Sequence, residues 1–591
     1  MCGIAAEFGP EASLRGVERM LFALAHRGPD AAGAKAIARL GVGGMCRLRI
    51  RGEDMALPAE GAGGLLISYN GEIYRDHAAG LGGIPQGLRG ETVSLARAMI
   101  DGSALDGMFA GVVIDQARAE AFVVRDPSGI KPLYMHCEAG CLALASEIPA
   151  LLAGRAGAAI RRAAIHDFLA IGRVSGSGTF FENLQLVPRG RWLRIEEGAG
   201  AAPRLVEVGA LSPLPEASLS LAETLNSAIL SATTSDSPIA LAISGGIDSA
   251  LLADALAKEG HTDIATFSVT TGTPGDHCAR LEDEGLSGQS WRSWSHHVVE
   301  VTPAAYYANL RYYIRASGQP TRMSSAPLYM AMGQAVARAG RRVLLSGEGA
   351  DELFFGYNSY ADLLPFADSH GAPAILHQLA RYYLSDERRR LVGWLIGADH
   401  LNGAEQRIRT DLADRIGDSF SQSLRSAEAE YRLQPLLERT DVALMAASVE
   451  GRVPFLHGGM PAIANRYTLP DCIVDGQTKR PLRAIAPDHL RAAMRKKANF
   501  RAPLAAWQGS SLVDQFMQAR KGLAPVFADL GIQEQGVERI IELARRGQSA
   551  VVSELLFCLL SLSLWLRDLG YGAQVDCDAA LCQPPFFEAA R

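Results

Sequence analysis

The sequence predicts an α/β fold in two parts, a strand-rich part followed by a part built around a parallel sheet. Short apolar runs of strand length, such as 65–69 and 121–124, recur between Gly-containing turns up to about residue 195. Further along, the apolar run 239–243 ends in a Gly-Gly turn, and a helix-like stretch follows over 249–258. A strand, a tight turn and a helix in that order form the repeating unit of parallel sheets.

The length and the local composition indicate where these parts divide. A chain of 591 residues is too long for one hydrophobic core, given ~100–200 residues per domain. Residues 196–216 are rich in Gly, Ala and Pro, so we expect a linker there between a first domain at 1–195 and a second at 217–575. Residues 360–570 are mostly helical by pattern, and 576–591 lack periodicity, which predicts a loose tail.

The charge balance and the start of the chain argue against several classes of function. The 58 basic and 64 acidic side chains give a net charge of −6, without the basic footprint of a nucleic-acid binder. The first residues lack the basic and apolar regions of a signal peptide. The longest apolar stretch, 551–566, is interrupted by polar residues and is typical of a buried helix. We therefore expect a cytoplasmic protein with no nucleic-acid or membrane partner.

The cysteines do not predict a disulfide framework or a structural metal. There are nine of them, an odd number, scattered along the chain without a CxxC pair, which indicates reduced thiols. No His falls at zinc-ligand spacing from them.

Cys2 stands apart from the other cysteines because it follows the initiator Met. Removal of Met1 would leave a free α-amine with a pKa of about 7.7–8.0, which can take the thiol proton without a histidine. A Cys at this position can also be accidental, so its neighbours decide the interpretation. Five motifs follow it in order: residues 27–30 (RGPD), 47–50 (RLRI), 70–74 (NGEIY), 126–134 (DPSGIKPLY) and 145–147 (ASE).

Together these motifs make the N-terminal third resemble the class II glutamine amidotransferases. The resemblance implies an αββα sandwich of the N-terminal-nucleophile type. It also implies that Cys2 attacks the side-chain amide of glutamine. The side chain of Asn70 and the backbone N–H of Gly71 would then form the oxyanion hole.

The same resemblance implies three residues that hold the glutamine substrate. Arg47 would bind its α-carboxylate, because a guanidinium matches the two carboxylate oxygens. Glu72 would hold the substrate backbone. Glu91 stands where the family usually has Asp, and would accept the substrate ammonium through a longer side chain. We expect an active glutaminase.

Residues 244–249 (SGGIDS) have the composition of a phosphate-binding turn. The two glycines let the backbone approach a phosphate, and the following helix presents unpaired N–H groups and the positive end of its dipole. Both serines add hydroxyl donors, and Asp248 can coordinate magnesium, which prefers oxygen ligands. Since a Gly-Gly turn before a helix is often only a turn, the interpretation again needs context.

That context is a second Gly-rich turn at 346–357 (SGEGADELFFGY) together with the segment 449–456 (VEGRVPFL). With the first loop, they resemble the synthetase domain of asparagine synthetase over about 217–510. The resemblance implies an adenine-nucleotide α-hydrolase-like domain with a parallel sheet. The residues that would bind ATP are Ser244, Gly245, Gly246, Asp248, Ser249, Ser346 and Gly347.

The resemblance also implies roles in the second reaction. Asp248 and Asp351 would hold Mg²⁺. Glu348 would lie in the reaction centre, where it orients ammonia or takes its proton. Lys479 would neutralise charge on the α-phosphate of ATP; the alternative is a solvated lysine on a helix.

The whole chain is thus identified as a member of the glutamine-hydrolysing asparagine synthetase family of carbon–nitrogen ligases. In the implied reaction, a substrate carboxylate displaces pyrophosphate from ATP, and ammonia released at Cys2 attacks the acyl-adenylate to form an amide. The implied partners are glutamine, ATP and a carboxylate acceptor, with ATP and Mg²⁺ as cofactors, in amino-acid biosynthesis. Related enzymes are often dimers, so we also consider a homodimer.

Several departures from the family pattern bear on the acceptor. Arg322 is out of register by one with the Arg that usually precedes a Thr-Pro, His457 replaces a usual Asp, and Phe355 replaces a usual Gly. The region 277–297, with its two tryptophans, is also atypical. Aspartate is the first single candidate, but a larger amino acid, a peptide C-terminus or a natural-product intermediate also fits these changes.

Two other functions stay open at this point. Ring-closing enzymes such as β-lactam synthetases and lasso-peptide cyclases share the fold and need no ammonia, but they generally lose the nucleophilic cysteine that this chain has as Cys2. A non-catalytic homologue would be expected to lose Asp248, Glu348 or Asp351, and all three are present.

Overall fold

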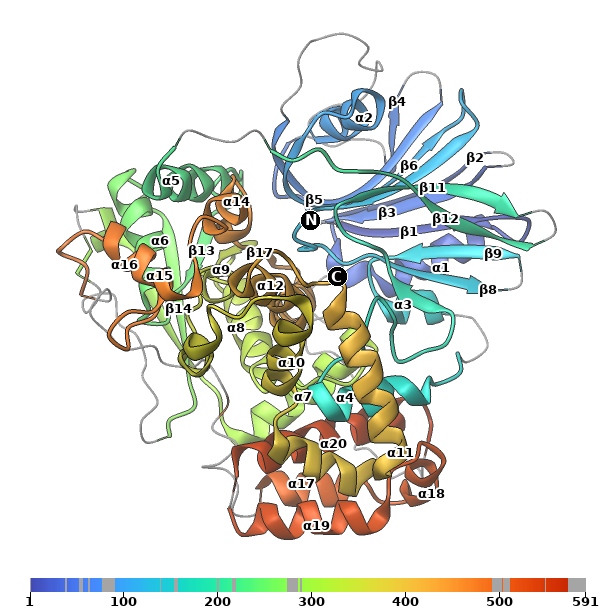
Figure 1. Ribbon diagram of the computed structural model, residues 1–591. Helices are drawn as coiled ribbons and strands as arrows, with labels where there is room; N and C mark the ends of the chain where they lie inside the picture. Colours follow the sequence, from blue (N-terminus) through green and yellow to red (C-terminus); the bar gives the residue numbers. More distant parts are fainter. Residues whose placement is uncertain are drawn as a thin grey trace.

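A computed structural model describes residues 2–37, 40–52, 57–61, 64–76, 91–138, 140–153, 158–198, 201–214, 219–273, 285–286, 290–491, 502, 511–547 and 549–571. Two bodies lie side by side in Figure 1, a β-sandwich formed by the first part of the chain and a larger, mostly helical body with a parallel sheet inside it. The predicted tail at 576–591 lies outside the described residues.

The first body is a sandwich of two antiparallel six-stranded sheets. One sheet has the order β10-β8-β9-β1-β3-β2, with bounds β1 (Cys2–Phe8), β2 (Ala31–Ile37), β3 (Gly41–Arg47), β8 (Tyr134–Glu138), β9 (Cys141–Ala145) and β10 (Leu184–Leu186). The other has the order β12-β11-β7-β6-β5-β4, with bounds β4 (Ala59–Gly61), β5 (Leu65–Asp76), β6 (Leu105–Asp115), β7 (Glu120–Arg125), β11 (Arg191–Gly198) and β12 (Ala201–Ala210).

Helices cover the outer faces of both sheets, so the predicted αββα sandwich is confirmed. α1 (Leu14–Ala23) packs on β1 and β3, and α2 (Glu91–Asp101) packs on β5 and β6. Apolar side chains from the two facing sheets fill the space between them; Ile4, Phe8, Leu66, Val112 and Ile114 belong to this cluster. Alternation along each strand explains the pattern, because every second side chain points to the same face.

The predicted linker at 196–216 is wrong for most of its length. β12 pairs with β11 in a register that joins Ile195 to Leu205 and Glu196 to Arg204, so this stretch is the edge hairpin of the second sheet. Leu205 packs against the sandwich core, and Leu211 is buried in a neighbouring cluster.

A second correction concerns the boundary of the first domain at residue 195. α4 (Arg162–Ile171) lies beside α7, α11 and α20 in Figure 1, away from the sandwich sheets. Its Phe168 contacts the Phe180 ring, and the rings of Phe180 and Phe181 lie 5.5 and 5.4 Å from Trp565 in α20. The apolar residues of this segment therefore form one core with C-terminal helices, although they precede residue 195 in the sequence.

The second body is organised around a five-stranded parallel sheet with the order β15-β14-β13-β16-β17. Its strands are β13 (Ile239–Ala242), β14 (Ile264–Thr270), β15 (Ser295–Glu300), β16 (Val343–Leu345) and β17 (Glu450–Arg452). α5 (Leu221–Ala232) and α6 (Ile247–Lys258) cover one face, and α7 (Pro303–Ser317), α8 (Ala326–Arg338) and α13 (Gln434–Met445) cover the other. The order in which strands are added reverses between β13 and β16, and the loops after these two parallel strands meet at their carboxyl ends, which is where α/β sheets bind ligands.

The prediction that residues 360–570 are mostly helical is confirmed. The remaining helices of this body are α9 (Ala350–Leu353), α10 (Ala372–Tyr383), α11 (Asp386–Ala413), α12 (Phe420–Glu428), α14 (Met460–Ala464), α15 (Leu469–Cys472), α16 (Arg480–Ile485), α17 (Ser511–Ala519), α18 (Ala524–Asp529), α19 (Glu534–Arg545) and α20 (Ala550–Asp568). α3 (Ile148–Leu152) connects the two bodies. A single π-helical turn, η5 (Ala429–Leu433), joins α12 to α13.

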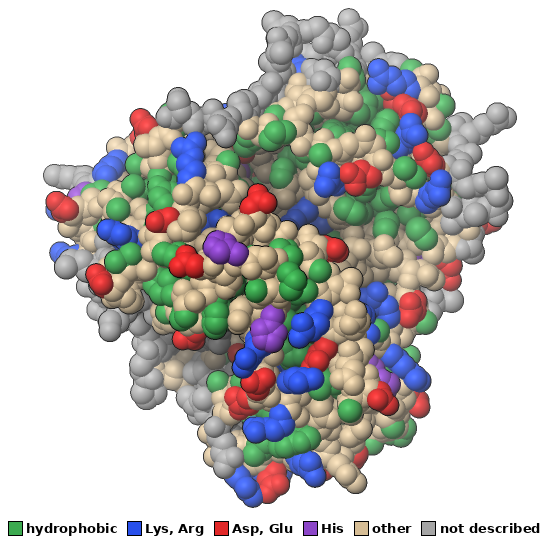
Figure 2. Space-filling model, in the orientation of Figure 1, with side chains coloured by type: hydrophobic (Ala, Val, Ile, Leu, Met, Phe, Trp, Pro, Cys, Tyr) green, Lys and Arg blue, Asp and Glu red, His purple; other side chains and the backbone are tan. Residues whose placement is uncertain are grey.

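α20 is long and apolar enough to cross a membrane, but it is a core helix here. Of its most apolar 18-residue window, 78% is buried inside the protein. Figure 2 shows acidic and basic side chains interspersed over the face it draws. The six cysteines within the described ranges are free thiols: Cys2, Cys46, Cys137, Cys141, Cys472 and Cys558.

Candidate active site

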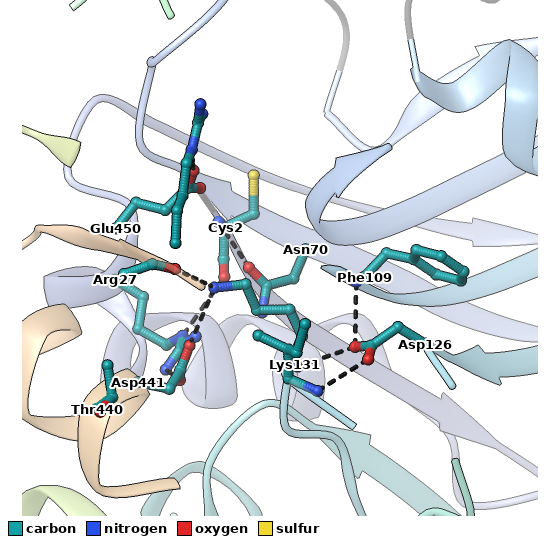
Figure 3. Close-up of polar contacts among 12 residues, drawn as sticks. Cys2, Arg27, Asn70, Phe109, Asp126, Lys131, Thr440, Asp441 and Glu450 are labelled. Atoms are coloured by element: carbon teal, nitrogen blue, oxygen red, sulfur yellow. Dashed lines mark hydrogen bonds and ion pairs between the residues drawn. The ribbon is translucent and has the colours of Figure 1, made fainter. Parts of the chain in front are cut away.

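Cys2 lies at the start of β1, between the two sheets of the sandwich. Its register partner in β3 is Arg47, and its backbone N–H donates to Oδ1 of Asn70 in β5, 3.1 Å away (Figure 3). The Nδ2 atom of Asn70 is buried and has no hydrogen-bond partner in the part of the chain that the structure describes. Gly71 follows with φ +126°, and a Cβ there would lie 1.9 Å from the carbonyl oxygen of Met108, so no other residue fits. The structure thus brings together Cys2, an unused amide donor and the predicted Arg47.

The Cys2 thiol is 6% exposed, and burial raises its pKa. Because the thiolate is the nucleophilic form, a buried thiol of raised pKa needs a base close by. The backbone nitrogen of Cys2 itself is held by Asn70, so a free amine at this position would be the nearest candidate.

The predicted glutamine-binding carboxylates gather around two arginines that sequence reasoning missed. Arg51 lies 3.1 Å from Glu72 and 3.0 Å from Glu91, and its carbonyl accepts a hydrogen bond from Arg47 at 2.9 Å. Arg452, in β17 of the other body, lies 3.3 Å from Glu72. Burial and the nearby Glu450 raise the pKa of Glu72 to about 7, against the opposing charge of Arg452.

A buried network of charges lies directly behind Cys2 (Figure 3). Nη1 of Arg27 pairs with Glu147 and with Asp441 of α13, both at 2.8 Å, and its Nε donates to the carbonyl of Cys2 at 3.4 Å. Nζ of Lys131 lies 3.5 Å from the same Asp441. The first, fourth and fifth motifs of the N-terminal third therefore meet here, and they meet on a helix of the second body.

The nucleotide loop has the geometry expected of a phosphate-binding turn. Gly245 adopts φ +73°, a left-handed conformation that favours glycine, and Gly246 caps α6 without a side-chain hydrogen bond. The hydroxyls of Ser244 and Ser249 lie 3.3 Å apart. The N–H groups of the first turn of α6 thus face the end of the sheet with two hydroxyls beside them.

The second Gly turn packs against the first with no room to spare. A Cβ on Gly347 would lie 2.7 Å from Cβ of Asp248, so glycine is needed for the two loops to meet. The hydroxyl of Ser346 is buried without a hydrogen-bond partner at this junction.

Asp248 and Asp351 converge on Lys479. Nζ of Lys479 lies 2.5 Å from Asp248 and 2.7 Å from Asp351. The side chain is only 2% exposed, so the alternative interpretation of Lys479 as a solvated lysine is wrong. Oδ1 of Asp248 is buried and has no hydrogen-bond partner within the described ranges, which leaves a hard oxygen ligand. Two carboxylates next to a phosphate loop fit Mg²⁺, which is typically bound by one or two carboxylates and substrate phosphates.

Gly356 makes this convergence possible, and the sequence alone gave no reason to select it. A Cβ at Gly356 would lie 2.0 Å from Cε of Lys479 and 2.0 Å from Oδ1 of Asp351. Any side chain there would push the lysine and the carboxylate apart.

Glu348 is held by two residues of α13 that were also missed. Thr440 donates to Glu348 at 2.5 Å, and Arg439 forms a close ion pair with it. Arg439 is fixed in turn, since its guanidinium lies 3.8 Å from the centre of the Tyr329 ring and donates to Ser325 at 2.7 Å.

These groups open into one cavity of about 520 Å³. The nucleotide half is lined by the two loops and by β14, and the far half extends past Glu348 to α11, η5 and α20. The charged residues of the far half are Arg322, Glu352, Arg388, Arg432, Arg439 and Glu554.

Arg322 differs from the other arginines of this cavity. Arg388 lies 3.3 Å from Glu554, Arg432 lies 3.2 Å from Glu428, and Arg439 pairs with Glu348. Arg322 instead donates to two backbone carbonyls and, within the described ranges, has no carboxylate partner. Burial and the neighbouring arginines lower its pKa to about 10.

The other departures from the family pattern do not line this cavity in the described part of the chain. His457 lies at the boundary of the two bodies, with its ring 4.4 Å from that of Tyr74. Phe355 is buried in a left-handed conformation with φ +49°, its ring covered by Arg425 at 4.7 Å. Trp294 donates to the carbonyl of His261 at 2.7 Å and belongs to the core around α6. Much of 277–289 lies outside the described residues.

Two sites of these kinds on one chain define a glutamine amidotransferase joined to a nucleotide-dependent ligase. The family model for asparagine synthase matches residues 220–567, and the model for the glutamine amidotransferase domain matches residues 97–204. The first match covers more than half of the chain, which therefore belongs to the asparagine synthase family. As a member, it is an enzyme, a carbon–nitrogen ligase.

Curated relatives agree with this assignment. The chain is 26% identical to glutamine-hydrolyzing asparagine synthetase 1 of Bacillus subtilis (strain 168), over 68% of this chain and 69% of that one. It is 26% identical to a putative glutamine-hydrolyzing asparagine synthetase of Mycobacterium tuberculosis (strain H37Rv), over 96% and 97%. Among solved structures, glutamine phosphoribosylpyrophosphate amidotransferase of B. subtilis matches 41% of this chain and 60% of that chain. The sequence identity is 14% and the TM-score is 0.23.

Proposed function

We propose that this chain hydrolyses glutamine at Cys2 and uses the ammonia to amidate a carboxylate that ATP has activated as an acyl-adenylate. The observation that carries the proposal is the contact of adjacent residues of α13 with both sites. Thr440 donates to Glu348 at 2.5 Å, and Asp441 pairs at 2.8 Å with Arg27, which donates to the carbonyl of Cys2.

In the first reaction, removal of Met1 leaves the α-amine of Cys2 next to Asn70. The amine takes the thiol proton, and the thiolate attacks the side-chain amide carbon of glutamine. The N–H of Gly71 and the free Nδ2 of Asn70 donate to the oxyanion that forms. Ammonia leaves with the proton, and water hydrolyses the thioester to glutamate. Arg47 would hold the substrate α-carboxylate, with Glu72 and Glu91 near its ammonium.

In the second reaction, an oxygen of the acceptor carboxylate attacks the α-phosphorus of ATP, and pyrophosphate leaves. The loop N–H groups and the hydroxyls of Ser244, Ser249 and Ser346 would hold the phosphates. Asp248 and Asp351 would hold Mg²⁺, whose charge offsets that of the leaving pyrophosphate. Lys479, which lies between these carboxylates, would offset charge on the same phosphates.

Ammonia then attacks the carbonyl carbon of the acyl-adenylate, a proton passes to a base and AMP leaves. Glu348 is the carboxylate we propose for this proton, because Thr440 and Arg439 fix its position in the cavity.

Arg322 supports an acceptor with a second carboxylate besides the reacting one. It is the cavity arginine without a carboxylate partner in the described ranges. An anionic group of the substrate would therefore pair with its guanidinium. L-aspartate meets this requirement and is the acceptor we propose first.

The test is mass spectrometry of the products formed from glutamine, ATP, Mg²⁺ and a panel of acids led by L-aspartate. We expect glutamate, AMP, pyrophosphate and an amide in equal amounts. Cys2→Ala should abolish glutamine hydrolysis, yet still form the amide from added ammonia. Cys137→Ala, which changes a half-buried free thiol in β8, is the matched control and should behave as the wild type.

The outcomes separate the alternatives. Amide or ring formation that never consumes glutamine would favour a ring-closing synthetase. Absence of ATP–pyrophosphate exchange with every acid would favour a non-catalytic homologue. Retention of Met1 on the purified protein would contradict the proposed nucleophile.

A further inference from the structure

The C-terminal end of α4 is bound by arginines of the acceptor half of the cavity. Arg388 donates to the carbonyls of Leu169 and Ala170 at 3.1 and 2.5 Å, and Nη1 of Arg322 donates to the carbonyl of Ile171 at 3.2 Å. The last carbonyls of a helix lack intrahelical partners and carry the negative end of its dipole, so they attract cations. A helix that precedes residue 195 therefore anchors two residues of the synthetase cavity.

Gly172, the residue that ends α4, leaves the space that Arg322 occupies. It adopts φ +76°, and its N–H donates to the carbonyl of Phe168 at 2.7 Å. A Cβ at Gly172 would lie 1.9 Å from Cδ and 2.9 Å from Cγ of Arg322. Contacts this short are not tolerated, so any other residue would move the arginine side chain out of its place.

The other end of the guanidinium is fixed as well. Nη2 of Arg322 donates to the carbonyl of Tyr431, which belongs to the π-helical turn η5, at 3.1 Å. A guanidinium has five N–H donors, and these two backbone bonds use two of them. Arg322 is therefore held between α4 and η5, with donors left for a carboxylate in the cavity.

We propose that Gly172 is a positioning residue of the acceptor site, which sets the affinity for the non-reacting carboxylate of the acceptor by fixing Arg322 on the end of α4. This inference rests on the proposed function, because it needs Arg322 to bind the acceptor. It assigns a part in acceptor recognition to a segment that lies in the N-terminal third of the chain.

The test compares Gly172→Ala with Gly176→Ala in ATP–pyrophosphate exchange driven by L-aspartate. Gly176 adopts a similar left-handed conformation with φ +69°, but a Cβ there meets nothing within 4 Å, so it controls for backbone strain. Gly172→Ala should raise the KM for L-aspartate about tenfold to a hundredfold, the loss expected for a charged hydrogen-bonded pair, with the KM for ATP unchanged. Gly176→Ala should change neither the KM for L-aspartate nor the KM for ATP.

β-Alanine, which is aspartate without its α-carboxylate, shows whether that carboxylate is involved. The wild type should prefer L-aspartate strongly, and Gly172→Ala should reduce the preference. In an Arg322→Ala background, Gly172→Ala should cause no further rise in the KM for L-aspartate, because the two changes remove the same interaction. Glutamine hydrolysis should stay at the wild-type rate in every variant.

Three results would overturn the inference. They are equal effects of Gly172→Ala and Gly176→Ala, an unchanged preference over β-alanine, and additive effects of the Gly172 and Arg322 changes. If Gly172→Ala does not fold, Gly172→Asn adds the same Cβ with less strain, since Asn tolerates the left-handed region better. No exchange by the wild type with any acid would instead overturn the proposed function, and this inference with it.

Discussion

At the scale of single residues, the clearest feature is a buried histidine. His457 is 3% exposed, and neither Nδ1 nor Nε2 has a hydrogen-bond partner among the described residues. Burial, with Arg452 and Arg75 nearby, lowers its pKa to about 3. A neutral imidazole is therefore required in the folded state, at the boundary where the family pattern places an acid.

Because His457 is buried in its neutral form, we expect the free energy of unfolding to fall in mild acid. The unfolded chain binds a proton at His457 below about pH 6.5, whereas the folded chain does so only near pH 3. The free energy of unfolding is therefore unaffected by this histidine well above pH 6.5, and it falls as the pH decreases through 6.5 toward 3. At pH 5.5 the loss is about 1.4 kcal/mol. His457→Asn should reduce the difference in urea midpoint between pH 7.5 and pH 5.5.

The exposed His370 gives the control for this measurement. His370→Asn should leave the wild-type pH dependence intact. If His457→Asn and His370→Asn show the same dependence, protonation of His457 does not limit the stability in acid.

At the scale of elements, short pieces of backbone decide the geometry of the synthetase site. Lys479 caps α16 in a left-handed conformation with φ +57°, a strained position for a residue with a side chain. The strain is maintained because the ammonium is held by Asp248 and Asp351 and because Gly356 leaves it room.

Gly356→Ala tests this arrangement directly. Its Cβ would lie 2.0 Å from both Lys479 and Asp351, so overpacking should destabilise the protein by about 1–3 kcal/mol. ATP–pyrophosphate exchange should fall at least about tenfold, since a displacement of ~1 Å near the reacting groups can cost that much. Glutamine hydrolysis at Cys2 should persist.

The control is Gly403→Ala in α11, where a Cβ would be 3.4 Å from the flexible end of Arg407. It should keep the exchange activity. Normal exchange in Gly356→Ala would show that the Lys479 position is not needed for nucleotide chemistry.

At the scale of the whole molecule, the site around Cys2 is completed by the second body. β17 of the parallel sheet supplies Arg452 to Glu72 of the glutaminase site, and α13 supplies Asp441 to Arg27 behind Cys2. Within the second body, α4 supplies the carbonyl that anchors Arg322, although this helix precedes residue 195 in the sequence. The two bodies therefore form one catalytic unit.

Arg452→Gln tests how far the glutaminase site depends on the second body. Arg452 is fully buried between Glu450 and Glu72, and removal of one partner from a buried ion pair costs about 3–5 kcal/mol. We expect a lower thermal midpoint together with a raised KM for glutamine.

Arg51→Gln is the matched change on the same carboxylate. Arg51 also pairs with Glu72 but is 34% exposed, so water can replace it and the stability should change by less than about 1 kcal/mol. Equal destabilisation by the two variants would contradict a special role for the contact between the bodies.

Much of this protein was predictable from sequence because glycine turns, catalytic residue types and strand periodicity are local properties. The αββα sandwich, the parallel sheet, the helical C-terminal part and the family were predicted from such patterns. The structure also brings together Cys2, Asn70 and Arg47, and it gathers Asp248, Asp351 and Lys479. The roles of these residues stay proposals.

Only the tertiary structure decided which distant partners complete each site. Thr440 and Gly172 lie outside the sequence motifs, and Arg452 and Gly356 do not stand out within theirs, because the importance of all four lies in contacts with residues far away in the sequence. The linker predicted at 196–216 is wrong for the same reason, because a run of small residues does not reveal that the strand 201–210 pairs with its neighbour in the sheet. Local chemistry thus determined what the sites contain, and long-range packing determined what holds them.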